Sequence, residues 1–309
     1  MHLTRRHLLL TPALLSAAPR PNSKFANVQI GAITYSFRAL PGSAEQTLQY
    51  LTDCNISAIE LMSNVPESFA GSPAASAPPI PGGRNATPEQ VEARRKLNEA
   101  VRQWRLATPM TKFKEFRKMY EAAGVKIYAF KLPPTLDMPD AEYDYIWNVA
   151  ETLGANHITM ELPTDDKLLA RVANFAAKRK LDIAFHTHGQ GGSSGFDRVL
   201  NASNHTALNL DIGHYFGVTG ESPVPIVEKY ASRIKSLHLK DRKSPANGGT
   251  NMPWGQGETP IAATLKLMHD RKYKFPAAIE YEYQTPANSD VLTEIKKCVD
   301  FCRQALRNI

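Results

Sequence analysis

The sequence predicts an α/β protein built as a single (β/α)8 TIM barrel. Eight short segments rich in apolar and β-branched residues occur along the chain, amphipathic helical patterns lie between them, and no internal break divides them into two units. Most of these segments are near-continuous apolar runs, as expected of parallel strands that are buried on both faces. A chain of 309 residues is long enough for one such barrel.

The predicted strands follow one another at the spacing that a β-then-α repeat requires. They are residues 28–37, 58–62, 126–132, 157–162, 182–188, 207–213, 234–241 and 277–283. Two of the intervening helical patterns, residues 110–124 and 141–154, each end at a glycine, Gly124 and Gly154, which is a common C-terminal stop. The barrel domain is therefore expected to span residues 26–309.

A Pro-rich insertion after the second strand departs from this repeat. Residues 64–85 are rich in Pro, Ala, Gly and Ser, and the composition cannot form a packed element of its own. A helix should follow, because Thr87, Pro88 and Gln90 form the pattern of a capping box with proline at its first turn. The insertion leaves the C-terminal end of a strand, so it is expected to form a lid or rim; a disordered surface loop is the alternative.

The N-terminal residues 1–23 have the pattern of a targeting segment. Arg5 and Arg6 precede a short apolar run, Leu8 to Ala18, and this resembles a twin-arginine export signal that delivers folded proteins to the bacterial periplasm. A basic N-terminal tail is the alternative. The run is too short for a stable membrane span, and no later stretch is apolar for long enough.

The charge and the cysteines exclude some classes of protein. The net charge is +7, but Lys and Arg are spread along the chain as on solvated helix faces, so no nucleic-acid partner is expected. Three cysteines make no disulfide framework, and core packing is their expected role.

Four polar residues stand at the C-terminal ends of different predicted strands. Carboxylates and an imidazole in such apolar contexts need a cation or a partner, and the strand ends of a barrel converge on one mouth. The mixed oxygen and nitrogen set suits Mn²⁺, Mg²⁺, Co²⁺ or Zn²⁺ and predicts one divalent metal site. Each residue also has a plain alternative: a turn, a solvent-facing strand end or a hydrogen-bonded core histidine. The four are Glu161, Asp211, His238 and Glu280.

The motifs around these residues resemble the sugar phosphate isomerase/epimerase family of the xylose isomerase-like TIM-barrel superfamily. The resemblance lies in Glu161 together with "LDIGH", "HLKD", "AIEYE" and "PWGQGETPI", and it covers the chain from about Val28 to its end. It implies that Glu161, Asp211, His238 and Glu280 hold the metal, and that His214 contacts the substrate.

Four further residues are candidates for the substrate site. His188 matches the family pattern, whereas His186 stands where an acidic residue is common. One of these two histidines is expected to assist proton transfer, and the alternative is that both form a hydrogen-bonded structural pair. Lys131 is expected to reach the mouth, with a solvent-directed amine as the alternative. Trp254 is expected to stack on a sugar, with core packing as the alternative.

The predicted chemistry is proton transfer next to a carbonyl that a metal ion polarises. Glu161 and Glu280 would act as base and acid on a ketose or keto-sugar, which makes the protein an isomerase or epimerase. The alternative is a lyase, dehydratase or 3-keto-glycoside-cleaving enzyme with the same enolate chemistry. An endonuclease IV-like phosphodiesterase and a non-catalytic sugar-binding barrel are less favoured. The expected partner is a small carbohydrate, and a homo-oligomeric state is left open.

Overall fold

The computed structural model describes residues 20–81, 85–189 and 193–307. Most of the predicted targeting segment, residues 1–19, lies outside them. Its last residue, Ser23, is fully buried, and its hydroxyl donates to the carbonyl of Ile30 at 2.6 Å. Ser23 is therefore part of the folded domain.

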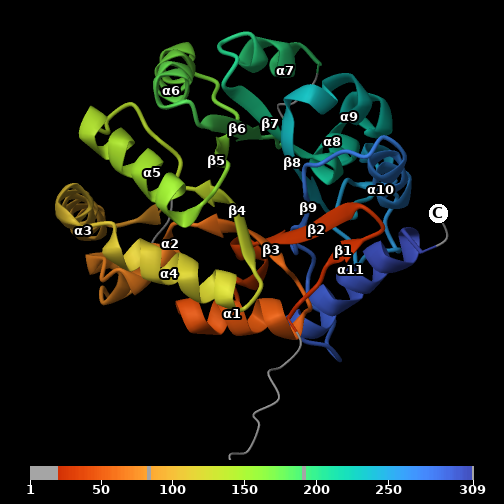
Figure 1. Ribbon diagram of the computed structural model, residues 1–309, viewed down its shortest axis with the longest axis horizontal. Helices are drawn as coiled ribbons and strands as arrows, with labels where there is room; N and C mark the ends of the chain where they lie inside the picture. The colour runs from red at the N-terminus through yellow and green to blue at the C-terminus, as the bar shows by residue number, and fades with distance from the viewer. Residues whose placement is uncertain (1–19, 82–84, 190–192, 308–309) are drawn as a thin grey trace, which may run out of the picture.

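Eight parallel strands close into a barrel, which confirms the predicted fold (Figure 1). Each pairs with the next along the chain, and the last pairs with the first, so the sheet has no free edge at that seam. Each predicted strand overlaps one observed strand, and seven of the eight predicted strands end one to four residues too late. A short antiparallel strand, β1 (Lys24–Phe25), precedes the barrel and pairs with β2. The barrel strands are β2 (Val28–Ile33), β3 (Ala58–Met62), β4 (Lys126–Lys131), β5 (His157–Glu161), β6 (Asp182–His186), β7 (Thr206–Asp211), β8 (Ile234–Leu239) and β9 (Ala277–Ile279).

Helices surround the barrel and bury its outer face. Gly154 ends α5 in a left-handed conformation with φ 77°, and Gly124 follows α4 with φ 84°, which is the reason that glycine stands at both stops. The helices are α1 (Ala44–Asp53), α2 (Asn64–Phe69), α3 (Pro88–Ala107), α4 (Thr111–Ala122), α5 (Asp140–Leu153), α6 (Asp166–Arg179), α7 (Ser193–Leu200), α8 (Ile212–Thr219), α9 (Val224–Tyr230), α10 (Ile261–Asp270) and α11 (Val291–Ala305). The 3₁₀ turns are η1 (Thr34–Phe37), η2 (Pro73–Ala75), η4 (Ala231–Arg233) and η5 (Pro245–Asn247).

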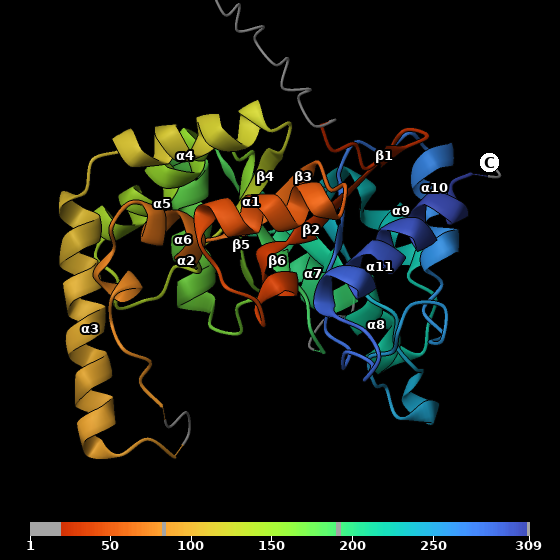
Figure 2. The ribbon, with the colours of Figure 1, turned by 90° about the horizontal axis from the view of Figure 1, so that it is seen from below.

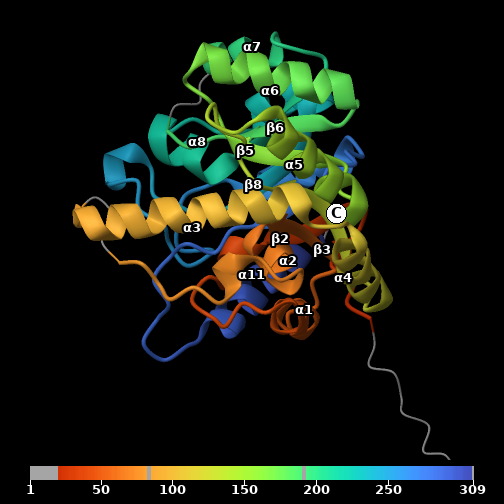
Figure 3. The same ribbon diagram turned by 90° about the vertical axis from the view of Figure 1, so that its left-hand side faces the viewer.

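The insertion after β3 contains α2, η2 and α3. The predicted capping box is present: the Thr87 hydroxyl accepts from the backbone of Gln90, whose side chain accepts from the backbone of Thr87. Arg105 joins α3 to α2 through Glu67 and to α5 through Glu142, each at 2.8 Å. Figures 2 and 3 show α3 running along one side of the barrel and projecting past the end at which α8 lies. A role for α3 as a lid stays a prediction.

The inside of the barrel is polar, whereas the layer between strands and helices is apolar. Because strand residues alternate in direction, one set of side chains faces the helices and the other faces the barrel axis. The axial set includes fully buried polar side chains, which hydrogen-bond to one another instead of packing as a dry core. They are Glu60, His157, Thr159, Asn209, Ser236 and His238.

Two further expectations concern composition. Cys54, Cys298 and Cys302 are free and buried, as expected of core residues. Within the described residues, no helix is both long enough and apolar enough to cross a membrane.

Candidate active site

Asp211 ends β7 and also begins α8. Its side-chain Oδ1 accepts the backbone N–H of His214 at 2.7 Å, which makes Asp211 the N-cap of that helix. The other oxygen, Oδ2, is buried and accepts no hydrogen bond, although Lys240 Nζ lies 3.0 Å away as an ion pair. The carboxylate of "LDIGH" therefore has one oxygen that stabilises the turn and one oxygen that is available at the mouth of the barrel.

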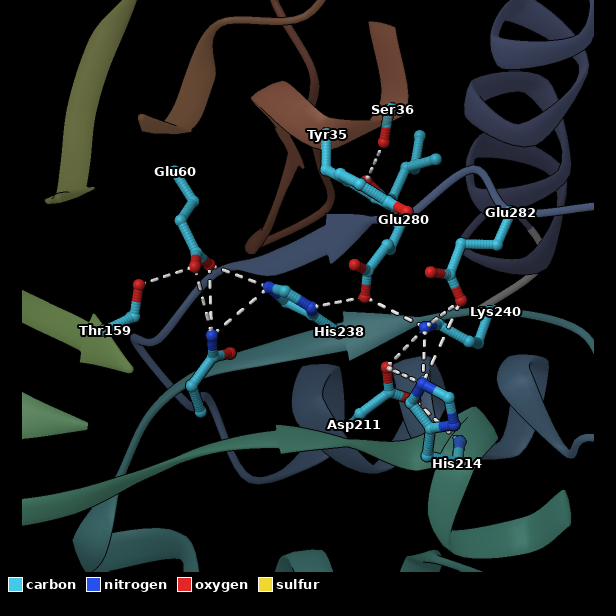
Figure 4. A network of polar contacts seen from close by, with 12 residues as sticks. Tyr35, Ser36, Glu60, Thr159, Asp211, His214, His238, Lys240, Glu280 and Glu282 are labelled. Carbon is cyan, nitrogen blue, oxygen red and sulfur yellow. Dashed lines mark hydrogen bonds and ion pairs between the residues drawn. The ribbon is translucent and has the colours of Figure 1, made fainter. Parts of the chain in front are cut away.

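His238, on β8, is held between two carboxylates (Figure 4). Its Nε2 lies 2.7 Å from Glu60 Oε2, and its Nδ1 lies 2.7 Å from Glu280 Oε2. Burial alone would lower the pKa of His238, but Glu60 and Glu280 outweigh burial and raise it to about 10. Burial would raise the pKa of Glu60, but chiefly His238 lowers it to about 2, so Glu60 is an anion deep in the barrel.

Lys240 lies in the middle of the acidic residues at the mouth. Its Nζ is 3.0 Å from Glu280 Oε2, 2.6 Å from Glu282 Oε2 and 2.9 Å from His214 Nε2. Gly213 makes room for it, since a Cβ at that position would stand 2.2 Å from Lys240 Cγ. The glycine of "LDIGH" is thus required by the lysine of "HLKD".

Four buried side chains could hold a metal ion. They bring their ligand atoms within 4.8 Å of one another. Two of these residues carry a buried polar atom without a hydrogen-bond partner, Nδ1 of His186 and Oδ2 of Asp211. A buried nitrogen such as His186 Nδ1 is costly without a partner, and Asp211 Oδ2 has only its ion pair with Lys240, so the residues fit a divalent cation. The four are His186, Asp211, His238 and Glu280.

The charge of the surrounding network also favours a cation. Five carboxylates and three Lys or Arg side chains are linked there by close contacts. One negative charge remains while His238 is protonated, and two remain once a metal ion takes the place of that proton. A divalent ion would neutralise that excess. The carboxylates are Glu60, Glu161, Asp211, Glu280 and Glu282, and the cations are Lys131, Lys240 and Arg242.

Glu161, the fourth ligand expected from the sequence, lies outside this group of four. It is paired in register with His186 across β5 and β6, but its Oε1 accepts from Lys131 Nζ at 2.8 Å. His186 takes the place beside His238, with 4.6 Å between the ring centroids. Glu161 Oε2 has no hydrogen-bond partner, and His188 Nε2 is 3.5 Å away. A ligand role for Glu161 stays a prediction.

The predicted substrate residues separate into two groups. His186, His188 and Lys131 line a pocket of about 200 Å³ at the mouth, together with Glu161, Glu280 and Glu282. His214 is beside it, with its ring centroid 4.6 Å from that of His188, and its pKa is lowered to about 3 by burial and by Lys240.

Trp254 lies outside the residues that line this pocket. It packs edge-on against Phe301 of α11, which is the core-packing alternative. Its loop is held by Asp241, whose carboxylate accepts the backbone N–H groups of Gly255 and Gly257 at 2.8 and 2.9 Å. The motif "PWGQGETPI" thus has a structural role next to the site.

Sequence reasoning did not identify Glu60 and Lys240 as site residues. The sequence did contain an indication for each residue. Glu60 is a lone carboxylate inside the apolar strand "AIELM", and Lys240 lies two residues after His238, just past the end of β8. A charge in such a strand needs a partner, but the partner lies on another strand.

Comparison with known proteins agrees with this geometry. A family model described as "Xylose isomerase-like TIM barrel" matches residues 166–304. This match covers somewhat less than half of the chain, so it is a similarity of the second half of the barrel to that family. The matched region contains Asp211 on β7, His238 on β8 and Glu280 directly after β9.

This TIM barrel is similar in sequence to curated dehydratases over part of its length. It is 33% identical over 78 residues to the inosose dehydratase of Clostridium botulinum (strain Eklund 17B / Type B), which is 24% of this chain and 26% of the relative. It is 30% identical over 111 residues to the inosose dehydratase of Clostridium beijerinckii, 34% of each chain. The aligned segments thus span about a quarter to a third of these relatives.

Solved structures match nearly the whole barrel at low identity, which is a likeness of fold. The probable 3-DHS dehydratase involved in petrobactin synthesis from Bacillus anthracis has a TM-score of 0.60 at 14% identity, covering 88% of this chain and 99% of that one. D-psicose 3-epimerase with D-tagatose from Clostridium cellulolyticum has a TM-score of 0.59 at 11% identity, covering 90% and 99%. Both eliminating and epimerising enzymes therefore share this fold.

Proposed function

We propose that this protein is a divalent-metal-dependent lyase that removes a proton beside the carbonyl of a keto-sugar and expels a group from the next carbon. The observation that carries the proposal is Glu161 Oε2, which accepts no hydrogen bond and belongs to the pocket that His186 and Glu280 also line. Dehydration is an elimination of this kind, and the curated relatives are dehydratases by name. Isomerisation or epimerisation, which the sequence alone favours, therefore becomes the second candidate.

The metal would be held by His186, Asp211, His238 and Glu280, which offer oxygen and nitrogen ligands. A divalent ion bound there, Mn²⁺, Mg²⁺, Co²⁺ or Zn²⁺, would polarise the carbonyl of the sugar and stabilise negative charge on its oxygen. Lys131 and Lys240 add fixed positive charge at the same end of the barrel.

Glu161 is the better placed of the two predicted catalytic glutamates to accept the proton. Its Oε1 is oriented by Lys131, and its Oε2 accepts no hydrogen bond, with His188 Nε2 3.5 Å away. Glu280 Oε2, in contrast, already contacts His238 and Lys240. A general base must reach the proton with an available lone pair, so we assign the base to Glu161 and a ligand role to Glu280.

His188 can protonate the leaving group. When Glu161 takes the proton, the C–H electron pair forms an enolate, and the enolate expels the oxygen of the neighbouring carbon with the C–O bond pair. Protonated His188 gives that oxygen its proton, and water or an alcohol leaves. Because His188 Nε2 is 3.5 Å from Glu161 Oε2, a proton passed between them restores both groups.

The second candidate, an epimerase, uses the same first step and returns the proton on the opposite face of the carbon. It is favoured by the likeness of fold to D-psicose 3-epimerase. The products distinguish the two candidates: an unsaturated sugar and a released water or alcohol indicate elimination, and a stereoisomer indicates epimerisation.

Hydrogen exchange in D₂O tests the shared first step. With excess Mn²⁺ and measured metal occupancy, the wild-type protein should place deuterium beside the carbonyl of a 3-keto-glucose substrate. Glu161→Gln should slow this by ~10²–10⁴-fold, the usual cost of losing a catalytic base. Glu115→Gln, an exposed glutamate on α4, is the matched control. Exchange at the wild-type rate by metal-loaded Glu161→Gln would assign the base to another residue.

A further inference from the structure

A second cavity adjoins the pocket of the candidate active site. It also has a volume of about 200 Å³ and shares two lining residues, Tyr35 and Met62, with that pocket. Its remaining walls come from the segment between β2 and α1, from α1 and from the start of α2, namely Thr34, Phe37, Arg38, Leu40, Pro41, Gly42, Thr47, Asn64 and Val65. We call it the outer cavity and the first one the inner pocket.

Tyr35 stands at the boundary between the two spaces and is held there firmly. Arg38 lies over its ring, with the guanidinium carbon 4.3 Å from the ring centroid, and donates to the carbonyl of Tyr281 at 2.6 Å. Ser36 fixes the same turn, because its hydroxyl donates to the carbonyl of Ile279 and accepts from the backbone of Tyr281, both at 3.0 Å. Figure 4 shows Tyr35 and Ser36 next to Glu280.

Tyr35 is nevertheless unusually accessible for an aromatic residue. It is 36% exposed, and it is the one aromatic side chain among the exposed large hydrophobic residues of the described ranges. A rigid, accessible ring at the boundary of two cavities is suited to contact the apolar C–H face of a sugar or the face of an aromatic ring.

The walls of the outer cavity are mainly apolar with a few polar groups. Phe37, Leu40 and Pro41 supply apolar surface, whereas Asn64 and Arg38 supply hydrogen-bonding groups. Ligand sites for small organic rings have this composition. A free monosaccharide in the inner pocket would leave this surface without a role.

We propose that the outer cavity is a subsite for the second ring of a glycoside, so that the substrate is a keto-glycoside whose leaving group is a sugar or aromatic alcohol. This rests on the proposed lyase function and specifies its substrate class. Glu161 takes the proton beside the carbonyl, the bond to the glycosidic oxygen breaks with its electron pair on oxygen, and His188 supplies the proton with which the ring alcohol leaves.

Binding of unreactive glycosides tests the subsite independently of catalysis. Methyl β-D-glucoside, phenyl β-D-glucoside and cellobiose lack the carbonyl, and their affinities for the Mn²⁺-loaded protein are measured by calorimetry. The two compounds with a second ring should bind at least about tenfold more tightly than the methyl glycoside, equivalent to burying roughly 60 Å² of apolar surface. Equal affinities, or no binding of any of the three, would overturn the proposal.

Variants that fill the outer cavity locate the effect. Gly42→Trp should remove the preference and leave methyl glucoside binding unchanged, because a Cβ at Gly42 meets nothing within 4 Å and the fold should be retained. Leu40→Trp, at another position in the same wall, should do the same. Leu106→Trp, at an exposed position on α3, is the matched control. A preference that persists in both cavity variants would place the second ring elsewhere.

The two proposals can fail separately. If a keto-monosaccharide exchanges hydrogen in D₂O but no ring preference is measured, the proposed proton abstraction stands and the subsite is wrong. If the ring preference is measured but a keto-glycoside shows no exchange, the subsite stands and the chemistry is wrong.

Discussion

Glu60 and His238 form a fully buried ion pair in the barrel, with 2.7 Å between Glu60 Oε2 and His238 Nε2 and 0% exposure of either side chain. Glu60 is itself oriented by Thr159 at 2.7 Å and Asn209 at 3.1 Å. Because Glu60 holds Nε2 of His238, the Nδ1 of the same ring faces the other candidate ligands, His186, Asp211 and Glu280. Glu60 is thus a positioning residue for the metal site.

Glu60→Gln should weaken metal binding while the barrel stays folded. Loss of a carboxylate behind a metal-binding histidine typically costs ~10–100-fold in metal affinity. The measurement is Mn²⁺ titration followed by electron paramagnetic resonance, with circular dichroism as the control for folding. An unchanged dissociation constant in a folded variant would contradict the positioning role.

Substitutions at the mouth should distinguish the two candidate ligand sets. We expect about one divalent ion per chain by elemental analysis, because the four clustered residues make one site. Asp211→Asn and His186→Gln should lower Mn²⁺ affinity more than Glu161→Gln, since Glu161 is paired with Lys131. The reverse order for His186 and Glu161 would support the set expected from the sequence.

His157 should make the protein less stable in mild acid. Burial lowers the pKa of His157 to about 4, below its value in the unfolded chain, so its neutral form is favoured by folding. Its contribution is complete above pH ~6.5 and is lost as the pH falls toward 4, by about 2 kcal/mol at pH 5.

The measurement for His157 is urea unfolding at pH 7.5 and pH 5. His157→Gln should lose less stability than the wild-type protein between these two values. The comparison isolates His157 because His238, whose raised pKa has the opposite effect, is present in both proteins. Equal pH dependence would show that His157 is not neutral in the folded state.

We propose that the N-terminal segment exports the protein to the periplasm. Residues 1–23 fused to a reporter should deliver it there, and changing Arg5 and Arg6 to Lys should abolish delivery, because the twin-arginine pathway reads this pair. Fractionation of cells that express each fusion measures the outcome. Continued delivery of the double variant would indicate another type of signal.

The sequence by itself determined the barrel and three of the four clustered residues. Apolar runs separated by amphipathic stretches identify parallel strands, and polar residues at strand ends must meet at one mouth. Asp211, His238 and Glu280 could be predicted because each stands at the end of its strand, where position along the chain defines position in space.

Only the tertiary structure decided which neighbours face one another across the barrel. Glu161 and His186 are adjacent in register, yet Lys131 on β4 draws Glu161 aside while His186 turns toward His238. The partner of Glu60 lies 178 positions away in the chain. Strand periodicity defines which side chains point inward, but the contacts that they make depend on the register and stagger of the strands. For Glu60 this matters directly, because the register of β3 against β4 shifts between Ile59 and Glu60. These distances are set when the sheet closes, so local sequence carries no record of them.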